Sequence, residues 1–281
     1  MSKVIFVTGA GRGLGTDIAR EALAGGHRVV ATGRRPGEVE KTLGGSADNL
    51  LVTKLDITSL DDAHAAAQAA VDRFGRVDVL INNAGNLFTG YFEEISPEQM
   101  RRQFETNLFG PMNVTRAVLP IMRAQRAGHV ITITSTAGLV GMEFTSAYAA
   151  SKFAAEGWME SLRYDVEPYN IHTTIVEPGY FRTELLVDGS TTWPELSIDD
   201  YAPRTAPRIE GMKAMNGRQP GDPAKLARAL LTITGQDKPL LRFVAGADAI
   251  EAAEAKATEL QAQAGASREL GGNLGHDDAR A

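Results

Sequence analysis

Short runs of apolar and β-branched residues alternate with helix-patterned segments along most of the 281-residue chain. Strands are predicted at residues 3–8, 28–32, 50–55, 77–82, 129–134, 170–176 and 240–244. Helical patterns lie between them, over 14–23, 59–73, 97–127 and 147–167, and a further one covers 246–263; the pattern over 97–127 is expected to bend near Gly110-Pro111. Strands that alternate with helices pair in parallel and are covered on both faces. We therefore expect an α/β fold with a doubly wound sheet of about seven strands.

Two segments depart from this alternation. Residues 183–222 are rich in proline and charge, and we expect an insertion that forms a lid over the sheet edge. The lid carries the apolar residues Leu185, Leu186, Trp193 and Tyr201. Residues 264–281 are Gly-rich and polar and are expected to be a disordered tail. Residues 1–263 are thus predicted to form one domain.

Composition excludes several classes of protein. The net charge of −6 is unfavourable for binding nucleic acid, which needs a basic surface. With no cysteine, the chain can form neither a disulfide framework nor a thiolate zinc site. No stretch approaches the roughly 20 apolar residues of a membrane span. We expect a soluble, cytoplasmic protein with no metal and no membrane partner.

A glycine-rich turn follows the first predicted strand and opens the first helix. Glycine permits a tight turn and lets the backbone approach a pyrophosphate, which the N–H groups of the helix N-terminus then bind. The residues predicted to bind the dinucleotide here are Gly9, Gly11, Arg12, Gly13, Leu14 and Gly15.

The end of the second strand predicts which dinucleotide is bound. NAD enzymes place an acid here for the ribose 2′-hydroxyl, but this chain has Arg34 and Arg35 instead. An arginine can grip a 2′-phosphate, so NADP(H) is favoured, with Arg12 as a third candidate cation. The alternative for Arg34 and Arg35 is a solvated surface patch. Asp56, next to Ile57 after the third strand, either accepts from the adenine amino group or caps the following helix.

Tyr148 and Lys152 share one face of a helix because they are four residues apart. A neighbouring ammonium lowers the pKa of a tyrosine and suits it to proton transfer. Ser135, just past a strand at the ligand-binding edge of the sheet, could stabilise negative charge on a substrate oxygen, or merely cap its loop. Asn107 either binds a water in a proton path or caps a broken helix.

Taken together, these motifs resemble the short-chain dehydrogenase/reductase family, which has a single-domain Rossmann fold. The matching residues are Thr8-Gly9, Gly13, Gly15, Asp56, Asn82-Asn83-Ala84-Gly85, Asn107, Ser135, Tyr148, Lys152, Pro178-Gly179 and Thr183. The resemblance implies that Tyr148 is the acid-base, that Lys152 binds the nicotinamide ribose and lowers the pKa of Tyr148, and that Ser135 orients the carbonyl. It also implies that Asn107 holds a relay water and that Asp56 lies near adenine. By the same resemblance, Asn83, Ala84 and Gly85 line the cofactor site, and Pro178, Gly179 and Thr183 close over the nicotinamide. Residues 177–183 look like a subgroup similar to 17β-hydroxysteroid and retinol dehydrogenases.

The expected activity is hydride transfer between NADP(H) and an apolar ketone, aldehyde or secondary alcohol. A non-catalytic NADP(H)-sensing protein is the alternative, and a sugar-nucleotide epimerase or dehydratase is a third reading. Family resemblance also implies a homo-oligomer, a dimer or tetramer, with helices 97–127 and 147–167 as candidate interfaces.

Overall fold

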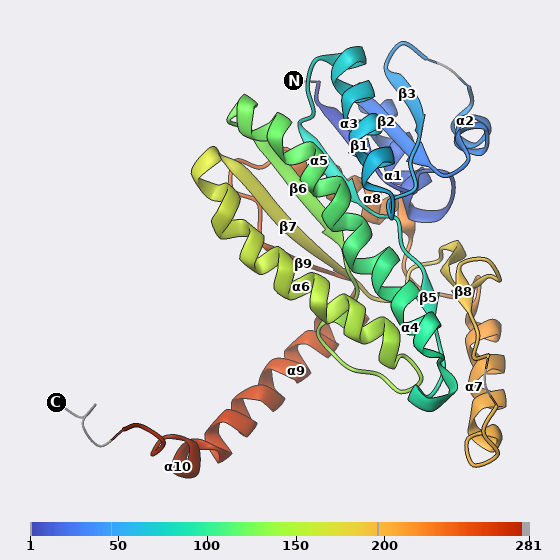
Figure 1. Cartoon of the computed structure of the whole chain (residues 1–281), viewed down its shortest axis with the longest axis vertical. Coiled ribbons are helices and arrows are strands. Elements are labelled where there is room, and N and C mark those ends of the chain that lie inside the picture. The colour runs from blue at the N-terminus through green and yellow to red at the C-terminus, as the bar shows by residue number, and fades with distance from the viewer. Residues whose placement is uncertain (1, 46, 196, 277–281) are drawn as a thin grey trace.

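The computed structural model describes residues 2–45, 47–195 and 197–276. At its centre lies a parallel seven-stranded sheet in the order β3-β2-β1-β4-β6-β7-β9 (Figure 1). The strands are β1 (Val4–Val7), β2 (Arg28–Gly33), β3 (Leu50–Lys54), β4 (Val79–Asn82), β6 (Gly128–Ile133), β7 (Ile171–Pro178) and β9 (Arg242–Ala245). All seven expected strands are confirmed. The strand order reverses between β1 and β4, and ligands of such sheets bind at this reversal, beyond the carboxyl ends of the strands.

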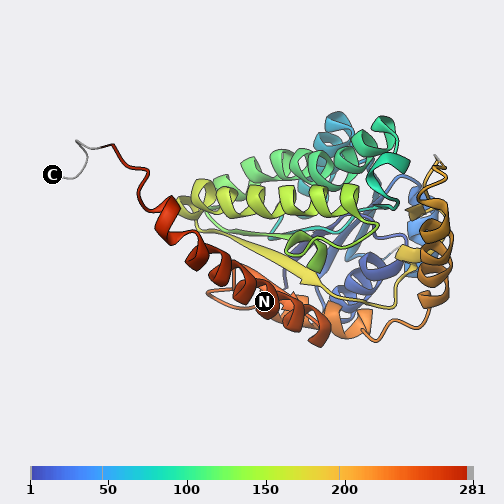
Figure 2. The same cartoon turned by 90° about the horizontal axis from the view of Figure 1, so that it is seen from below.

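Helices cover both faces of the sheet (Figure 2). On one face lie α3 (Leu60–Phe74), α5 (Gly110–Gln125) and α6 (Ser146–Val166), and on the other α1 (Gly13–Ala24) and α8 (Pro223–Thr234). Strand β1 shows why: Val4 and Phe6 belong to the first core cluster, whereas Ile5 and Val7 belong to the second. Alternate side chains of a strand point to opposite faces, so a fully apolar strand needs a helical layer on each side.

The expected break in the helical pattern over 97–127 is confirmed. Helix α4 (Pro97–Phe104) leads into a π-helical turn, Glu105–Phe109, before α5 begins at Gly110. Ser96 and Gln99 form a capping box that fixes the start of α4. The π turn contains Asn107 and shifts the phase of the helix by about one residue.

The lid region contains more regular structure than its sequence suggested. Strand β8 (Thr191–Thr192) pairs in parallel with β5 (Leu87–Phe88), and α7 (Ala202–Met215) follows beside them (Figure 1). Helix α2 (Pro36–Leu43) and helix α8 were also not anticipated.

The C-terminal segment also departs from expectation. Helix α9 (Ala247–Ala266) projects from the body in both views, and α10 (Arg268–Gly271) follows it (Figures 1 and 2). Helical structure therefore continues past residue 263, where disorder was expected to begin. Residues 277–281 of that tail lie outside the described residues. In the described ranges, no helix combines the length and apolar character needed to cross a membrane.

Candidate active site

The turn between β1 and α1 depends on glycine. Gly9 and Gly13 have φ angles of 69° and 55°, in the left-handed region. A Cβ on Gly15 would lie 2.3 Å from the Gly9 carbonyl oxygen and 2.5 Å from Asn83 Nδ2, so a larger residue would push the turn away from Asn83. Arg12 stands at the N-cap of α1 but makes no capping hydrogen bond. The first N–H groups of α1 thus have no side-chain cap and suit a phosphate.

This turn borders a cleft of about 990 Å³ at the carboxyl ends of the strands. All the predicted site residues line it except Gly15, which lies behind the turn, and Asn107. The lining residues that were predicted are Gly9, Gly11, Arg12, Gly13, Leu14, Arg34, Arg35, Asp56, Ile57, Asn83, Ala84, Gly85, Ser135, Tyr148, Lys152, Pro178, Gly179 and Thr183. The fold thus brings predicted site residues that are up to 174 positions apart in the sequence, from Gly9 to Thr183, into one cavity.

Strand β4 is tied to β1 beside the cleft by the buried Thr8. Its hydroxyl accepts hydrogen bonds from the backbone N–H groups of Asn83, at 2.9 Å, and Ala84, at 3.0 Å. Asn83 Nδ2 in turn donates to the Thr8 carbonyl oxygen at 2.9 Å. These bonds hold the segment from Asn83 to Gly85 against the glycine turn.

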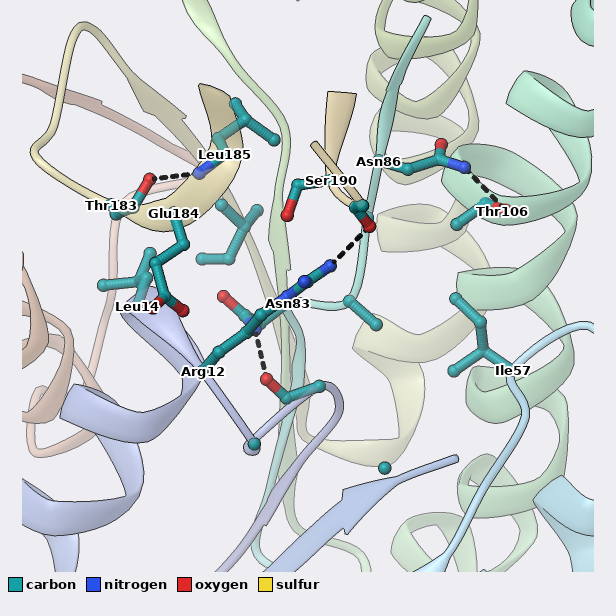
Figure 3. A pocket seen from close by; sticks show the side chains of 18 of the residues that line it. Arg12, Leu14, Ile57, Asn83, Asn86, Thr106, Thr183, Glu184, Leu185 and Ser190 are labelled. Atoms are coloured by element: carbon teal, nitrogen blue, oxygen red, sulfur yellow. Dashed lines mark hydrogen bonds between the residues drawn. The ribbon is translucent and has the colours of Figure 1, made fainter. Parts of the chain in front are cut away.

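The three candidate cations have different surroundings. Arg12 reaches across the cleft and donates to the Gly189 carbonyl oxygen at 3.0 Å, beside Ser190 (Figure 3). Arg35 pairs with Glu38 at 3.0 Å. Arg34 makes no hydrogen bond or ion pair within the described part of the chain. Arg34 and Arg35 are solvent-exposed, and both border the cleft.

Asp56 does not cap helix α3. That position is taken by Ser59, whose hydroxyl accepts from the N–H of Asp62 at 3.1 Å. The Asp56 carboxylate instead accepts from the N–H and the hydroxyl of Thr58, at 3.0 and 2.8 Å. The capping alternative is therefore wrong, and Asp56 lines the cleft beside Ile57.

Tyr148 and Lys152 lie on successive turns of α6 and both face the cleft. Lys152 Nζ is 5.6 Å from the centroid of the Tyr148 ring and donates to the Ile133 carbonyl oxygen at 2.9 Å. Ser135, directly after β6, borders the same cleft, and its Oγ accepts from the N–H of Ala137 at 3.1 Å. Ser135 thus caps its turn and also faces the cavity.

Burial dominates the titration of this pair. It raises the pKa of Tyr148 to about 12, although a hydrogen bond with Ser135 acts in the opposite direction. Burial also lowers the pKa of Lys152 to about 8, and the charge of Glu156 partly offsets this. Burial is thus the largest influence on the pKa of both side chains, and the lowering of the Tyr148 pKa by Lys152 stays a prediction.

Asn107 lies behind the cleft and is hydrogen-bonded to the loop after β4, which lines it. Its Oδ1 accepts from the N–H of Asn86 at 3.0 Å, and its Nδ2 donates to the Asn86 carbonyl oxygen at 3.0 Å. Nδ2 also contacts the Ser151 hydroxyl at 3.3 Å, and that hydroxyl donates to the Tyr148 carbonyl oxygen at 2.7 Å. Asn107 therefore links the loop after β4 to the helix that carries Tyr148, and it does not cap α4 or α5.

The segment after β7 passes over the opening of the glycine turn. A Cβ on Gly13 would lie 3.7 Å from Thr183 Cβ, and the Thr183 hydroxyl accepts from the N–H of Leu185 at 3.4 Å (Figure 3). Position 179 must be glycine because a Cβ built there would lie 2.2 Å from a carboxylate oxygen of Asp248.

An apolar group surrounds Tyr148. It consists of Leu87, Ala137 and Ala149, with Leu185, Leu186 and Met212 of the lid packed against it. Of the four apolar lid residues singled out in the sequence, Leu185 and Leu186 thus lie beside Tyr148. Trp193 and Tyr201 have other contacts: Trp193 Nε1 donates to Asp188 at 3.0 Å, and Tyr201 stacks on Tyr91. Met212 was missed because nothing in the local sequence marks it.

Comparison with known proteins agrees with this geometry. The family model for short chain dehydrogenase matches residues 3–192, well over half of the chain. Oxidoreductase BOA17 of Botryotinia fuckeliana is 34% identical over 271 residues, which cover 96% of this chain and 98% of that protein. The 3-ketodihydrosphingosine reductase of Bacteroides thetaiotaomicron is 34% identical over 247 residues, covering 87% and 88%.

A solved structure shares the whole architecture. The crystal structure of a short-chain dehydrogenase from Streptomyces avermitilis superposes with a TM-score of 0.89 at 35% identity, covering 98% of this chain and all of that one. The expected fold and the resemblance drawn from the motifs are both confirmed. The chain belongs to the short-chain dehydrogenase/reductase family of oxidoreductases.

Proposed function

We propose that the protein is an NADPH-dependent carbonyl reductase that also runs in reverse on secondary alcohols. The observation that carries this proposal is the meeting of Tyr148, Lys152 and Ser135 in the cleft that the glycine turn opens. The turn fits a dinucleotide, since Gly15 leaves no room for a Cβ and the start of α1 lacks a side-chain cap. NADP(H) is favoured because Arg34 extends beside this cleft where NAD enzymes have an acid.

When bound, the nicotinamide supplies or accepts the hydride. The Tyr148 hydroxyl gives its proton to the carbonyl oxygen, and the Ser135 hydroxyl donates a hydrogen bond to the same oxygen. The Lys152 ammonium stabilises the phenolate that forms. Because Tyr148 is 8% exposed, little water competes for this proton.

The substrate is proposed to be an apolar ketone or aldehyde. Leu185, Leu186 and Met212 pack around Tyr148, so a substrate that reaches its hydroxyl lies against apolar side chains. A relative is named a reductase of 3-ketodihydrosphingosine, a ketone, which fits the same direction of reaction.

A titration with NADPH and with NADH, followed by a panel of apolar carbonyl compounds, tests the proposal. We expect tighter binding of NADPH and its oxidation by part of the panel. Tyr148→Phe should keep NADPH binding and lose turnover by at least about 100-fold, since general acid catalysis contributes that much. Tyr169→Phe, on a tyrosine outside the cleft, is the matched control. Normal turnover in Tyr148→Phe would contradict the mechanism, and tight binding without any turnover would favour a cofactor sensor.

We also propose that the protein is a homo-oligomer. Phe109, at the end of the π-helical turn before α5, and Phe153 and Tyr164, on α6, are 46%, 44% and 66% exposed. Exposed aromatic side chains on neighbouring helices mark a surface suited to a second copy. Light scattering coupled to size exclusion distinguishes a dimer or tetramer from a monomer. A cytoplasmic location stays a prediction from the cysteine-free composition.

A further inference from the structure

Three carboxyl groups converge on one guanidinium at the back of the helix that carries Tyr148 and Lys152. Arg242 of β9 contacts Glu156 and Glu177 through Nη1, and its Nη2 lies 2.8 Å from Glu160 Oε1. The side chains of Glu156 and Glu177 are 5% and 0% exposed. Glu160 is half exposed to solvent. Two of the three acids are therefore buried against a single positive charge.

This arrangement disfavours the ionisation of both buried carboxyl groups at once. One guanidinium cannot compensate two buried carboxylates, and removing a second negative charge from water is strongly unfavourable. Glu156 Oε1 and Glu177 Oε2 are both buried, and neither has a hydrogen-bond partner in the described part of the chain. Burial, together with the charge of Glu177, raises the pKa of Glu156 to about 7. The charge of Glu156 therefore changes close to neutral pH.

The cluster is one helical turn from Lys152. Residues four apart on a helix share a face, so Glu156 is the next acidic neighbour of Lys152 along α6. Its charge raises the pKa of Lys152, against the burial that lowers it to about 8. Glu156 also packs against the turn that follows Ser135, since a Cβ on Gly138 would lie 2.8 Å from Glu156 Oε1.

The charged groups around Glu156 come from each element packed against it. Helix α6 supplies Lys152 and Glu160, β7 supplies Glu177, and β9 supplies Arg242. Helix α9 packs near the Ser135 turn and carries Asp248, whose carboxylate accepts from the N–H of Tyr180 at 2.8 Å.

We propose that Glu156 is a positioning residue of the reaction: its ionised form keeps Lys152 as an ammonium, and Glu177 and Arg242 set whether Glu156 is ionised. The inference rests on the proposed roles of Tyr148 and Lys152. Loss of the Glu156 charge would lower the pKa of the buried Lys152, so that more of it is neutral. A neutral Lys152 no longer stabilises the Tyr148 phenolate.

A direct test measures the charge of Lys152 without turnover. Protein carrying lysine labelled with carbon-13 at the ε carbon is titrated by NMR, and the Lys152 signal is assigned by its loss in Lys152→Arg. In Glu156→Gln the pKa of Lys152 should fall by about one unit, the effect expected of a charge one turn away in a poorly solvated site. In the wild type, the Lys152 signal should also show a second inflection near pH 7, because Glu156 ionises there. This measurement needs no substitution, so it still tests the proposal if Glu156→Gln fails to fold.

Two matched variants separate the proposal from a general loss of structure. Glu160→Gln removes a carboxylate from the same guanidinium but leaves Glu156, so the pKa of Lys152 should change by less than about 0.3 unit. Glu177→Gln should leave Glu156 ionised and likewise leave Lys152 unchanged or slightly more basic. An unshifted Lys152 in Glu156→Gln, or equal shifts in all three variants, would overturn the proposal.

Kinetics then connect the charge to the reaction. The upper limb of the pH profile of kcat/KM for carbonyl reduction should move to lower pH in Glu156→Gln, in parallel with the Lys152 titration. A shifted titration in a protein that turns over no carbonyl would disprove the proposed function and leave the control of Lys152 by Glu156 standing. Normal carbonyl reduction together with an unshifted titration of Lys152 would support the proposed function and disprove the control of Lys152 by Glu156.

Discussion

Replacement of Arg34 by alanine gives the sharpest test of cofactor preference. Arg34 lies beside the cleft, and within the described chain it has no protein partner to give up when a phosphate arrives. A charge-assisted hydrogen bond contributes about 1.5–3 kcal/mol. The side chain is exposed, so screening places the effect at the lower end, which is about a tenfold rise in the NADPH dissociation constant.

The assay is a fluorescence titration of the variant with NADPH and with NADH. NADH lacks the 2′-phosphate, so its dissociation constant should change by less than about twofold, and the NADPH effect should shrink at high salt. Arg35→Ala is the matched control. Arg35 already pairs with Glu38, so its loss should weaken NADPH binding less, by about threefold or under. Equal weakening of NADPH and NADH in Arg34→Ala would refute contact with the 2′-phosphate.

Three further changes probe the turn, the core and one buried base. Gly15→Ala places a methyl group 2.3 Å from the Gly9 carbonyl oxygen, so NADPH binding should be lost in a titration while circular dichroism shows a folded chain. Met159→Ala empties a fully buried site and should lower the free energy of unfolding in urea by about 2–5 kcal/mol. Burial lowers the pKa of His129 to about 3, so below the ordinary pKa near 6.5 only the unfolded chain takes up this proton. His129 therefore leaves the free energy of unfolding unchanged above pH 6.5 and lowers it by about 1.4 kcal/mol per pH unit as the pH falls from 6.5 toward 3. Urea unfolding of His129→Gln, compared with His64→Gln, should show that this loss of stability at low pH disappears only in the first variant.

The strands and the pairing of Tyr148 with Lys152 on one helix face could be predicted because their signals are local. Seven runs of apolar and β-branched residues mark the strands, of which β1 and β4 are buried along their whole length, and Gly110-Pro111 marks the break between α4 and α5. Helix α7 has no buried residue among its fourteen, so no apolar periodicity could reveal it. The sequence does carry a signal for the start of helix α8, although we did not predict this helix. Asp222 caps it through its side chain, and Pro223 takes the first helical position.

The cluster behind Lys152 could not be predicted from local sequence. A glutamate is normally exposed, and only the guanidinium of Arg242, which is 65 positions beyond Glu177, allows that side chain to be buried. The path of Arg12 to Gly189 is equally non-local, since 177 positions separate the two residues. Such contacts follow from how the strands are ordered, and no periodicity within one segment encodes them.

The lid is attached to the body in two different ways. Strand β8 is joined to β5 by main-chain hydrogen bonds, from Leu87 to Ser190 and from Thr89 to Thr192, both 3.0 Å long. Helix α7 is attached mainly by exposed side chains, including ion pairs from Arg204 and Arg208 to Glu143. Exposed ion pairs are weak and are screened by salt, whereas the β5–β8 hydrogen bonds are not. Salt should therefore weaken the attachment of α7 more than the pairing of β8 with β5, leaving α7 held by the packing of Met212 and by the hydrogen bonds from Thr205 to the buried Glu94.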